Sequence, residues 1–268
     1  MEAVKNSNTS GNLFNRHLAE MDRLLRGVRE DVQKKTAKKP EVVFLPWRAE
    51  NWDSMESIWK AAKEDSAFDV SVIPLPWYYR DEEGSVKEQV QYDAEAFPDY
   101  VEITDYREYS LPLHHPEMII INNPYDQCNY TTVIDPFFWA KQLKGWTEHL
   151  VYVPWFVTDE IDIEQFPEDP AVYNMRYYVT VPGVVHSDLV VVQSELMRTA
   201  YIKALTDMSG EEYAEVWNKK VCAFGSPLRE ERNPGEGYEA IPVSPIWEQI
   251  KGRIREEETA REDSNGNQ

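Results

Sequence analysis

The residues that could do chemistry in this sequence lie directly after apolar runs. Proline and aromatic residues follow four such runs, at residues 46–48 (Pro-Trp-Arg), 74–79, 122–126 and 154–156. Proline cannot continue the hydrogen-bond ladder of a sheet, so each of these segments ends a strand and turns the chain outward. Aromatic walls with a few polar groups between them are what a small-molecule cleft requires. The pattern therefore favours ligand binding, and the candidate contacts are Trp47, Arg48, Asn123, Tyr125, Asp126, Asn129 and Ser194, with Arg80 and Asn122 as further polar groups.

The same aromatic residues have a simpler interpretation. Large aromatic side chains are common in protein cores, and at strand ends they can seal the top of a sheet or pack a long loop onto it. The sequence leaves both interpretations open. If residues 122–131 form only a turn, Asp126 and Asn129 should tolerate alanine. If they line a cleft, both side chains should point towards Trp47, Arg48 and the residues around Ser194.

None of the standard catalytic motifs occurs in the sequence. There is no Gly-x-Gly-x-x-Gly after a strand, no Gly-x-x-x-x-Gly-Lys-Ser/Thr, no His-Glu-x-x-His and no Gly-x-Ser-x-Gly. We therefore predict no cofactor and no metal ion, and the catalytic residues stay unassigned. His114, His115 and His186 precede predicted strands, away from the expected cleft, and are interpreted as structural. The acidic residues 159–164 are interpreted as a solvated loop.

The elements that must position the candidate residues are strands and helices in alternation. Short, continuous runs rich in Val and Ile are typical of strands buried on both faces of a parallel sheet. Asp53 and Glu56 have the spacing of a capping box before an amphipathic helix, and Ser194 can cap a helix that ends near Leu205. The prediction is an α/β fold with a doubly wound, mainly parallel Rossmann-like sheet. Its strands are expected at residues 42–45, 70–73, 118–121, 150–153, 189–192 and 221–224.

The carboxyl ends of parallel strands share one edge of the sheet, which is where open α/β folds bind ligands. We divide the chain into residues 1–36 (a helix and a linker), residues 37–228 (the α/β domain) and residues 229–268 (a helix followed by a disordered acidic tail). The aromatic and acidic residues 76–116 are expected to form a hairpin-like insertion. The predicted helix at residues 13–31 either packs on its own domain or pairs with a second copy in a homodimer.

Composition limits the classes of partner. The net charge of −20 argues against nucleic acid, because phosphate binding needs a basic surface that is not apparent here. Cys128 and Cys222 lie far apart in the sequence, which fits a reducing compartment. No run of about 18 apolar residues occurs, and the first residues lack the apolar core of a signal peptide. The expected location is the cytoplasm.

Several of the segments described above resemble a known family. The chain is similar, over residues 42–227, to the amino-terminal half of bacterial proteins related to CDP-glycerol glycerophosphotransferases, the GT-B-like enzymes of teichoic-acid synthesis. The most distinctive stretch is Asn123-Pro124-Tyr125-Asp126 with Asn129 and Thr131. The resemblance also covers the segments LPWRAENWDSMESIWKAAKED, VIPLPWYYRDEEGSV, NNPYDQCNYTTVIDPFFWAKQLK, LVYVPWFV and SDLVVVQSELMRTAYIKAL.

The resemblance implies the acceptor-side domain of a glycerophospho- or glycosyltransferase of cell-envelope polymer synthesis. A second Rossmann-like domain would then bind a CDP- or UDP-linked donor, and this chain would be inactive without it. The resemblance further implies a phosphate-bearing acceptor, which would suit Arg48, and peripheral association with the inner face of the membrane. The chain departs from the family in lacking a Trp-His-Gly-like motif. The alternative is a non-catalytic binding or scaffold module with the same fold.

Overall fold

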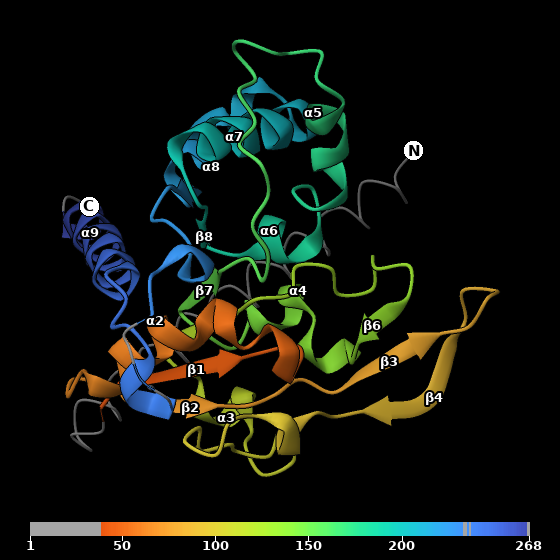
Figure 1. The fold of residues 1–268 in the computed structure, drawn as a ribbon. Coiled ribbons are helices and arrows are strands. Elements are labelled where there is room, and N and C mark those ends of the chain that lie inside the picture. Colours follow the sequence, from red (N-terminus) through yellow and green to blue (C-terminus); the bar gives the residue numbers. More distant parts are fainter. Residues whose placement is uncertain (1–38, 233–234, 236, 267–268) are drawn as a thin grey trace, which may run out of the picture. The chain divides into compact units, whose positions relative to one another are not determined.

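The computed structural model describes residues 39–232, 235 and 237–266 (Figure 1). The helix predicted for residues 13–31, and with it the proposed dimer contact, lies outside these residues. None of the helices in the described part of the chain combines the length and apolar character that a membrane crossing needs.

A six-stranded parallel sheet forms the centre of the described chain. Each strand lies within two residues of the range that its apolar run predicts, so the predicted α/β fold with a mainly parallel sheet is confirmed. Short Val- and Ile-rich runs form these strands because β-branched side chains pack well on a pleated surface that is covered on both faces. The strands, in their order across the sheet, are β2 (Asp69–Val72), β1 (Glu41–Leu45), β5 (Met118–Ile121), β7 (His149–Tyr152), β8 (Leu189–Val191) and β9 (Val221–Cys222).

Helices cover both faces of this sheet, as the doubly wound prediction requires (Figure 1). Successive side chains of β1 alternate between the faces. Val42 and Phe44 pack with α2 (Asp53–Glu64) and α9 (Ile246–Gly266). Val43 and Leu45 belong to the opposite core, which is covered by α4 (Ala140–Leu143), α6 (Pro182–His186) and α7 (Glu195–Ser209). The other described α-helices are α3 (Leu111–His114), α5 (Pro170–Asn174) and α8 (Ala214–Lys220).

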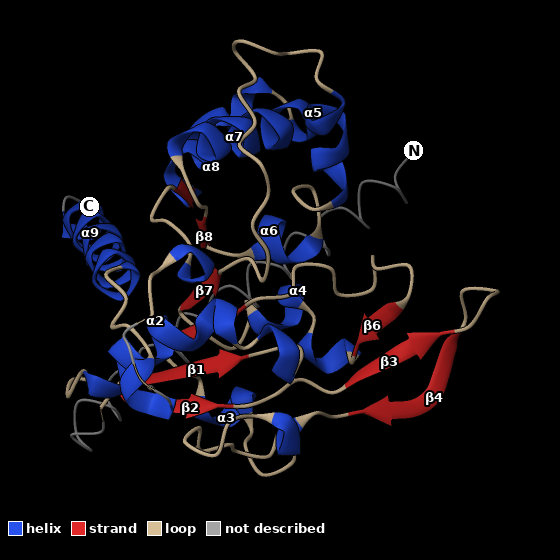
Figure 2. Cartoon of the chain, in the orientation of Figure 1, coloured by secondary structure: helices blue, strands red, loops and turns tan. Residues whose placement is uncertain are grey.

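A second, antiparallel sheet extends from the main one (Figure 2). Its order is β4 (Val86–Gln91), β3 (Trp77–Arg80) and β6 (Thr132–Ile134). The hairpin of β3 and β4 agrees with the hairpin-like insertion expected within residues 76–116. The sequence does not predict β6, because three residues are too few to show a strand pattern.

Helix ends differ in how well their caps were predicted. The capping box at Asp53 is wrong, because the N-cap of α2 is Trp52 and no side chain caps it. Glu56 is instead buried and accepts hydrogen bonds from the Tyr100 hydroxyl and from Arg232. The cap at Ser194 is confirmed, since its hydroxyl accepts a hydrogen bond from the backbone N–H of Met197 at 3.2 Å.

Helix α9 extends to Gly266, into the segment that the sequence predicts to be a disordered acidic tail. Low apolar content predicted the loss of order there. The amino-terminal turns of α9 are anchored by Trp247 and Ile250, which are buried against the sheet, and helix formation propagates at little cost from an anchored turn.

Candidate functional site

The strand order reverses between β1 and β5, and the carboxyl ends of these two strands are tied together. The chain leaves β1 for β2 on one side and returns to β5 on the other, which is the topology that creates a ligand crevice in open α/β sheets. Asn122 follows β5 and is fully buried. Its Oδ1 accepts a hydrogen bond from the backbone N–H of Trp47 at 3.0 Å, and its Nδ2 donates to Ser54 Oγ at 3.2 Å. Asn122 therefore fixes the segment after β1 against the segment after β5.

Three tryptophans from different elements meet at this edge. The ring centroid of Trp47, which follows β1, lies 6.1 Å from that of Trp77 in β3 and 5.6 Å from that of Trp155, which follows β7. The strand-terminating aromatic residues thus share one edge, as the Pro-Trp repeats predict. Trp47 and Trp77 are only 5% and 2% exposed, so the interpretation that they seal the sheet also remains.

Arg48 lies against these rings. Its guanidinium carbon is 5.4 Å from the Trp47 ring centroid and 5.0 Å from that of Trp77, within the range of cation–π attraction. Arg48 also forms an ion pair with Glu50 at 2.7 Å, and the Glu50 carboxylate is largely exposed. We call Trp47, Arg48, Trp77 and Trp155 the tryptophan–arginine cluster.

Hydrogen bonding in the tryptophan–arginine cluster is incomplete. Nε of Arg48 and the indole nitrogens of Trp47, Trp77 and Trp155 are buried and have no hydrogen-bond partner among the described residues. Leaving a buried donor unpaired costs about 1–3 kcal/mol, so native proteins usually satisfy such groups. Several unpaired donors in one cluster can be satisfied together by an oxygen-rich ligand.

The loop after β5 is hydrogen-bonded to α4 and α6, because Asp126 accepts from Ala140 N–H and Pro124 accepts from Gly183 N–H. Asp126 is 4% exposed, and its Oδ2 accepts a hydrogen bond from the backbone N–H of Ala140 at 2.9 Å. Burial raises the pKa of Asp126 to about 7, although this hydrogen bond opposes the increase. Asn123 accepts a hydrogen bond from the backbone N–H of Tyr125 at 2.8 Å, which stiffens the turn. Asp126 is therefore buried, and its hydrogen bond comes from Ala140, whereas the cleft hypothesis expects it to point towards Trp47 and Arg48.

Arg80 lies in β3 of the antiparallel sheet, and Asn129 lies in the loop that leads to β6. Asn129 Oδ1 accepts a hydrogen bond from the backbone N–H of Thr131 at 2.8 Å. The Arg80 guanidinium donates to the backbone oxygens of Asn129, Gln127 and Gly84. Among the described residues, no hydrogen bond or ion pair joins Asp126 or Asn129 to Arg48. No polar contact therefore supports the expectation that Asp126 and Asn129 lie close to Arg48.

Ser194 contacts a different part of the carboxyl edge. Its hydroxyl donates to Glu160, and Arg229 forms an ion pair with the same carboxylate at 2.8 Å. Burial alone would raise the pKa of Glu160, but hydrogen bonds from Ser194, Gln193 and Arg229 lower it. Glu160 lies in an exposed loop, as the sequence predicts, and its hydrogen bonds and ion pair also join the segments after β7, β8 and β9.

A small cavity lies beside these contacts, at the carboxyl ends of β7 and β8. It has a volume of about 20 Å³, room for about one water molecule, and Phe156, Gln193 and Tyr201 are among its lining residues. Trp155 packs against Phe156 with ring centroids 5.4 Å apart, so the cavity adjoins the tryptophan–arginine cluster. No group of three His, Cys, Asp or Glu side chains suited to a metal ion occurs within the described ranges.

The structure therefore brings together part of the predicted set. Trp47 and Arg48 meet at the switch point, Asn123, Tyr125 and Asp126 lie in the adjoining loop, and Asn129 and Ser194 serve other contacts. The sequence places Asn122 among the further polar groups at this edge, and Trp77 and Trp155 among its aromatic walls, but none of the three is in the candidate contact set. The Pro-Trp pairs at 76–77 and 154–155 match the pair at 46–47, and that repeat is the signal that predicts both tryptophans at this edge.

Comparisons with known proteins give matches to solved structures. No family model and no curated protein matches the chain. A UDP-N-acetylglucosamine 2-epimerase shows 10% identity with a TM-score of 0.37, over 80% of this chain and 55% of that one. The UDP-GlcNAc 2-epimerase of Neisseria meningitidis bound to UDP-GlcNAc shows 8% identity with a TM-score of 0.35, over 70% of this chain and 47% of that one. The chain spans about half the length of these structures, and likenesses at this level carry no conclusion about activity or substrate.

Proposed function

We propose that the tryptophan–arginine cluster binds a phosphate-bearing acceptor, and that this chain is the acceptor-side domain of a GT-B-like glycerophospho- or glycosyltransferase. The observation that carries the proposal is the set of unpaired buried donors around Arg48 at the reversal point of the strand order. The family resemblance of residues 42–227 supplies the reaction class.

The chemistry of the cluster suits a phosphate. A guanidinium binds phosphate oxygens through two parallel hydrogen bonds, and the stacked tryptophans restrict the orientation of Arg48 before the ligand arrives. The Glu50 carboxylate now paired with Arg48 is 60% exposed, and an exposed ion pair contributes at most about 1 kcal/mol. A doubly charged phosphate can therefore displace Glu50 from Arg48.

The transfer reaction itself needs groups from outside this cluster. Asp126 in the adjoining loop has a pKa raised to about 7, but its carboxylate accepts a hydrogen bond from Ala140. Among the described residues, no acid–base pair faces Arg48. In the proposed enzyme a second Rossmann-like domain binds the CDP- or UDP-linked donor and supplies the missing groups. No catalytic residue is assigned in this chain.

Binding can be tested with glycerol 3-phosphate as the probe. Titration followed by tryptophan fluorescence and by NMR of the indole N–H signals should perturb Trp47, Trp77 and Trp155. Arg48→Gln should weaken binding at least tenfold with little change in melting temperature, because Arg48 is half-exposed. Arg107→Gln removes an equally charged but exposed arginine, which pairs with Asp105 and lies over the Tyr106 ring, and serves as the matched control.

The proposal fails if glycerol 3-phosphate, CDP-glycerol and UDP-N-acetylglucosamine all leave the indole signals unchanged at millimolar concentration. It also fails if Arg107→Gln weakens binding as much as Arg48→Gln does, because the binding would then be diffuse.

The second candidate is a binding module without catalysis, favoured by the absence of an acid–base pair facing Arg48 within the described residues. The two candidates separate in a transfer assay. The protein is mixed with a donor-binding partner domain, a radiolabelled CDP or UDP donor and a phosphorylated acceptor. Label in the acceptor supports the transferase, whereas ligand binding at the tryptophan–arginine cluster with no transfer supports the binding module.

A further inference from the structure

The opposite edge of the parallel sheet carries a concave surface of a different kind. It lies at the amino ends of β8 and β9, has a volume of about 400 Å³, and is lined by Lys144, His186, Asp188, Lys219 and Lys220 together with smaller and apolar residues. We call it the amino-edge concavity. It is remote in the fold from the strand ends that carry the tryptophan–arginine cluster, because parallel strands place their amino and carboxyl ends at opposite edges.

The charge of the amino-edge concavity is opposite to that of the whole chain. Three lysines and one aspartate line it, whereas the chain as a whole has a net charge of −20. Lysines gathered in one hollow of a strongly acidic protein create a local potential that attracts anions.

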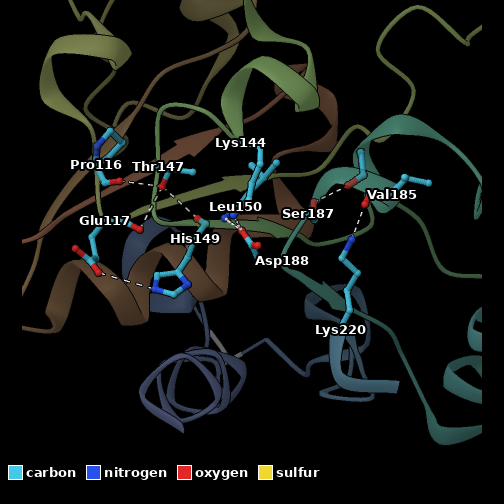
Figure 3. A network of polar contacts seen from close by, with 11 residues as sticks. Pro116, Glu117, Lys144, Thr147, His149, Leu150, Val185, Ser187, Asp188 and Lys220 are labelled. Atoms are coloured by element: carbon cyan, nitrogen blue, oxygen red, sulfur yellow. Dashed lines mark hydrogen bonds and ion pairs between the residues drawn. The ribbon is translucent and has the colours of Figure 1, made fainter. Parts of the chain in front are cut away.

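Asp188, which lines the amino-edge concavity, already forms an ion pair with Lys144 (Figure 3). One oxygen of Asp188 pairs with Lys144 Nζ at 2.6 Å and accepts a hydrogen bond from the backbone N–H of Leu150 at 2.9 Å. This carboxylate forms its ion pair with Lys144, and among the described residues it forms none with Lys219 or Lys220, although its charge favours the charged form of Lys220.

Lys220 is hydrogen-bonded but not neutralised (Figure 3). Its ammonium donates to the backbone oxygen of Val185 at 2.5 Å, which uses one of three N–H donors and supplies no counter-charge. Lys219 is largely exposed and lies 3.6 Å from Glu215, also exposed, in a pair of the kind that contributes little.

The cations in and around this hollow repel one another. The pKa of Lys220 is lowered to about 8, mainly by burial; the charge of Asp188 opposes this change, and Lys144 contributes to it less strongly. Burial, Lys220 and Lys141 all lower the pKa of His186. Crowded like charges are stabilised when an anion enters between them.

We propose that the amino-edge concavity binds a compact, multiply charged anion of the phosphate or pyrophosphate class, held by Lys219 and Lys220. This site is separate from the acceptor site proposed above and does not depend on it. The two lysines are adjacent at the end of α8, directly before β9, and both are among the residues that line the hollow. The volume of the concavity, about 400 Å³, is large enough for a pyrophosphate group and part of the molecule that carries it.

A purely structural role for Lys220 is the competing explanation. Its hydrogen bond satisfies a carbonyl in the last turn of α6, where a positive charge is favourable to a helix end. That role predicts a loss of stability when Lys220 is replaced, and no effect of Lys219 on anion binding. The two explanations therefore differ at Lys219.

The test titrates inorganic pyrophosphate into the full chain at fixed ionic strength, by calorimetry and by NMR. We expect saturable binding that Lys219→Gln and Lys220→Met each weaken at least tenfold. Lys87→Gln, which removes an exposed lysine from the antiparallel sheet, should bind as the unchanged protein does. If Lys220→Met fails to fold, Lys219→Gln decides the result, because Lys219 is largely exposed.

Covalent trapping gives a second readout. Pyridoxal 5′-phosphate combines a phosphate with an aldehyde, and a lysine amine adds to the aldehyde carbon as water leaves. Borohydride then reduces the imine to a stable secondary amine, which peptide mapping locates. We expect Lys219 or Lys220 to be labelled first, with protection by pyrophosphate. The proposal is overturned if pyrophosphate does not bind, if Lys87→Gln weakens binding equally, or if labelling is spread over exposed lysines such as Lys87 and Lys203 without protection.

Discussion

The two edges of the parallel sheet leave different requirements unmet. At the carboxyl edge, Arg48 has a counter-charge in Glu50, but buried N–H donors around it have no partners among the described residues. At the amino edge, Lys220 donates a hydrogen bond to Val185, but among the described residues its ammonium forms no ion pair, since Asp188 pairs with Lys144. Hydrogen bonding is incomplete at one edge, and charge balance is incomplete at the other.

Because of this difference, the two edges suit different kinds of ligand. Unpaired donors within an aromatic wall discriminate by geometry, so they favour a ligand with oxygens at defined positions. Surplus positive charge in an open hollow attracts anions with little geometric demand. One short helix contacts both regions, because α6 donates from Gly183 N–H to the oxygen of Pro124 after β5 and accepts from Lys220 at Val185.

The largest effect is expected at Gly183, where α6 meets the loop after β5. A Cβ at this position would lie 2.4 Å from Pro124 Cα, and backbone atoms cannot yield as a flexible side chain can. Gly183→Ala should destabilise the fold by about 4 kcal/mol in urea unfolding. Gly252 in α9 has no heavy atom within 4 Å of such a Cβ, so Gly252→Ala should be neutral or stabilise by up to about 1 kcal/mol. Equal changes in unfolding free energy for Gly183→Ala and Gly252→Ala would show that α6 and this loop are not closely packed at Gly183.

Asn122 is expected to have the next largest effect. Asn122→Ala leaves the buried N–H of Trp47 without its acceptor and removes the bond to Ser54, so we expect a loss of about 3 kcal/mol in unfolding free energy. Asn129→Ala removes contacts within one turn and should cost about 1 kcal/mol or less. Similar losses at both positions would contradict a special role for Asn122 in joining β1 to β5.

The buried carboxyl of Asp126 should make stability depend on pH. Its pKa is raised to about 7 in the folded protein, so the folded state binds the proton more tightly than the unfolded state does. The stabilisation is complete below the pKa of the unfolded carboxyl and is lost as the pH rises through 7. Between pH 5 and pH 8 this contribution should fall by roughly 2–3 kcal/mol.

Asp126→Asn should remove that pH dependence, because the amide oxygen can still accept from Ala140 N–H without becoming charged. The measurement compares urea unfolding of both proteins at pH 5, 6, 7 and 8. Parallel pH profiles for the two proteins would show that Asp126 does not carry the effect.

The smallest effect concerns the ion pair of the amino edge. Lys144→Met removes the partner of Asp188, which is mostly buried, and should cost about 1 kcal/mol at low salt and less at 1 M NaCl. Lys203→Met removes a fully surface pair with Asp207 and should change the unfolding free energy by no more than about 0.5 kcal/mol. If Lys203→Met costs as much as Lys144→Met, the network at the amino edge adds nothing to an ordinary surface pair.

Local residue patterns were sufficient to predict the elements that depend on neighbouring residues. Val- and Ile-rich runs predicted all six parallel strands, because burial on both faces selects continuous apolar residues. Ser194 predicted the start of α7, because a hydroxyl at that position can accept a backbone hydrogen bond whatever the rest of the fold does. The Pro-Trp-Arg segment predicted an aromatic residue and a cation at the end of β1.

Contacts between residues far apart in the sequence could not be predicted, because they depend on how the elements pack. Glu56 has the spacing of a helix cap, yet it is buried with Tyr100 and Arg232, because α2 packs against segments far along the chain. Asp126 turns towards Ala140, and Asn129 bonds within its own loop, because sheet order and the crossing connections set what each loop faces. The hollow between Lys144 and Lys220 likewise exists only because β7, β8 and β9 are neighbours in the sheet, a pairing that local residue patterns do not encode.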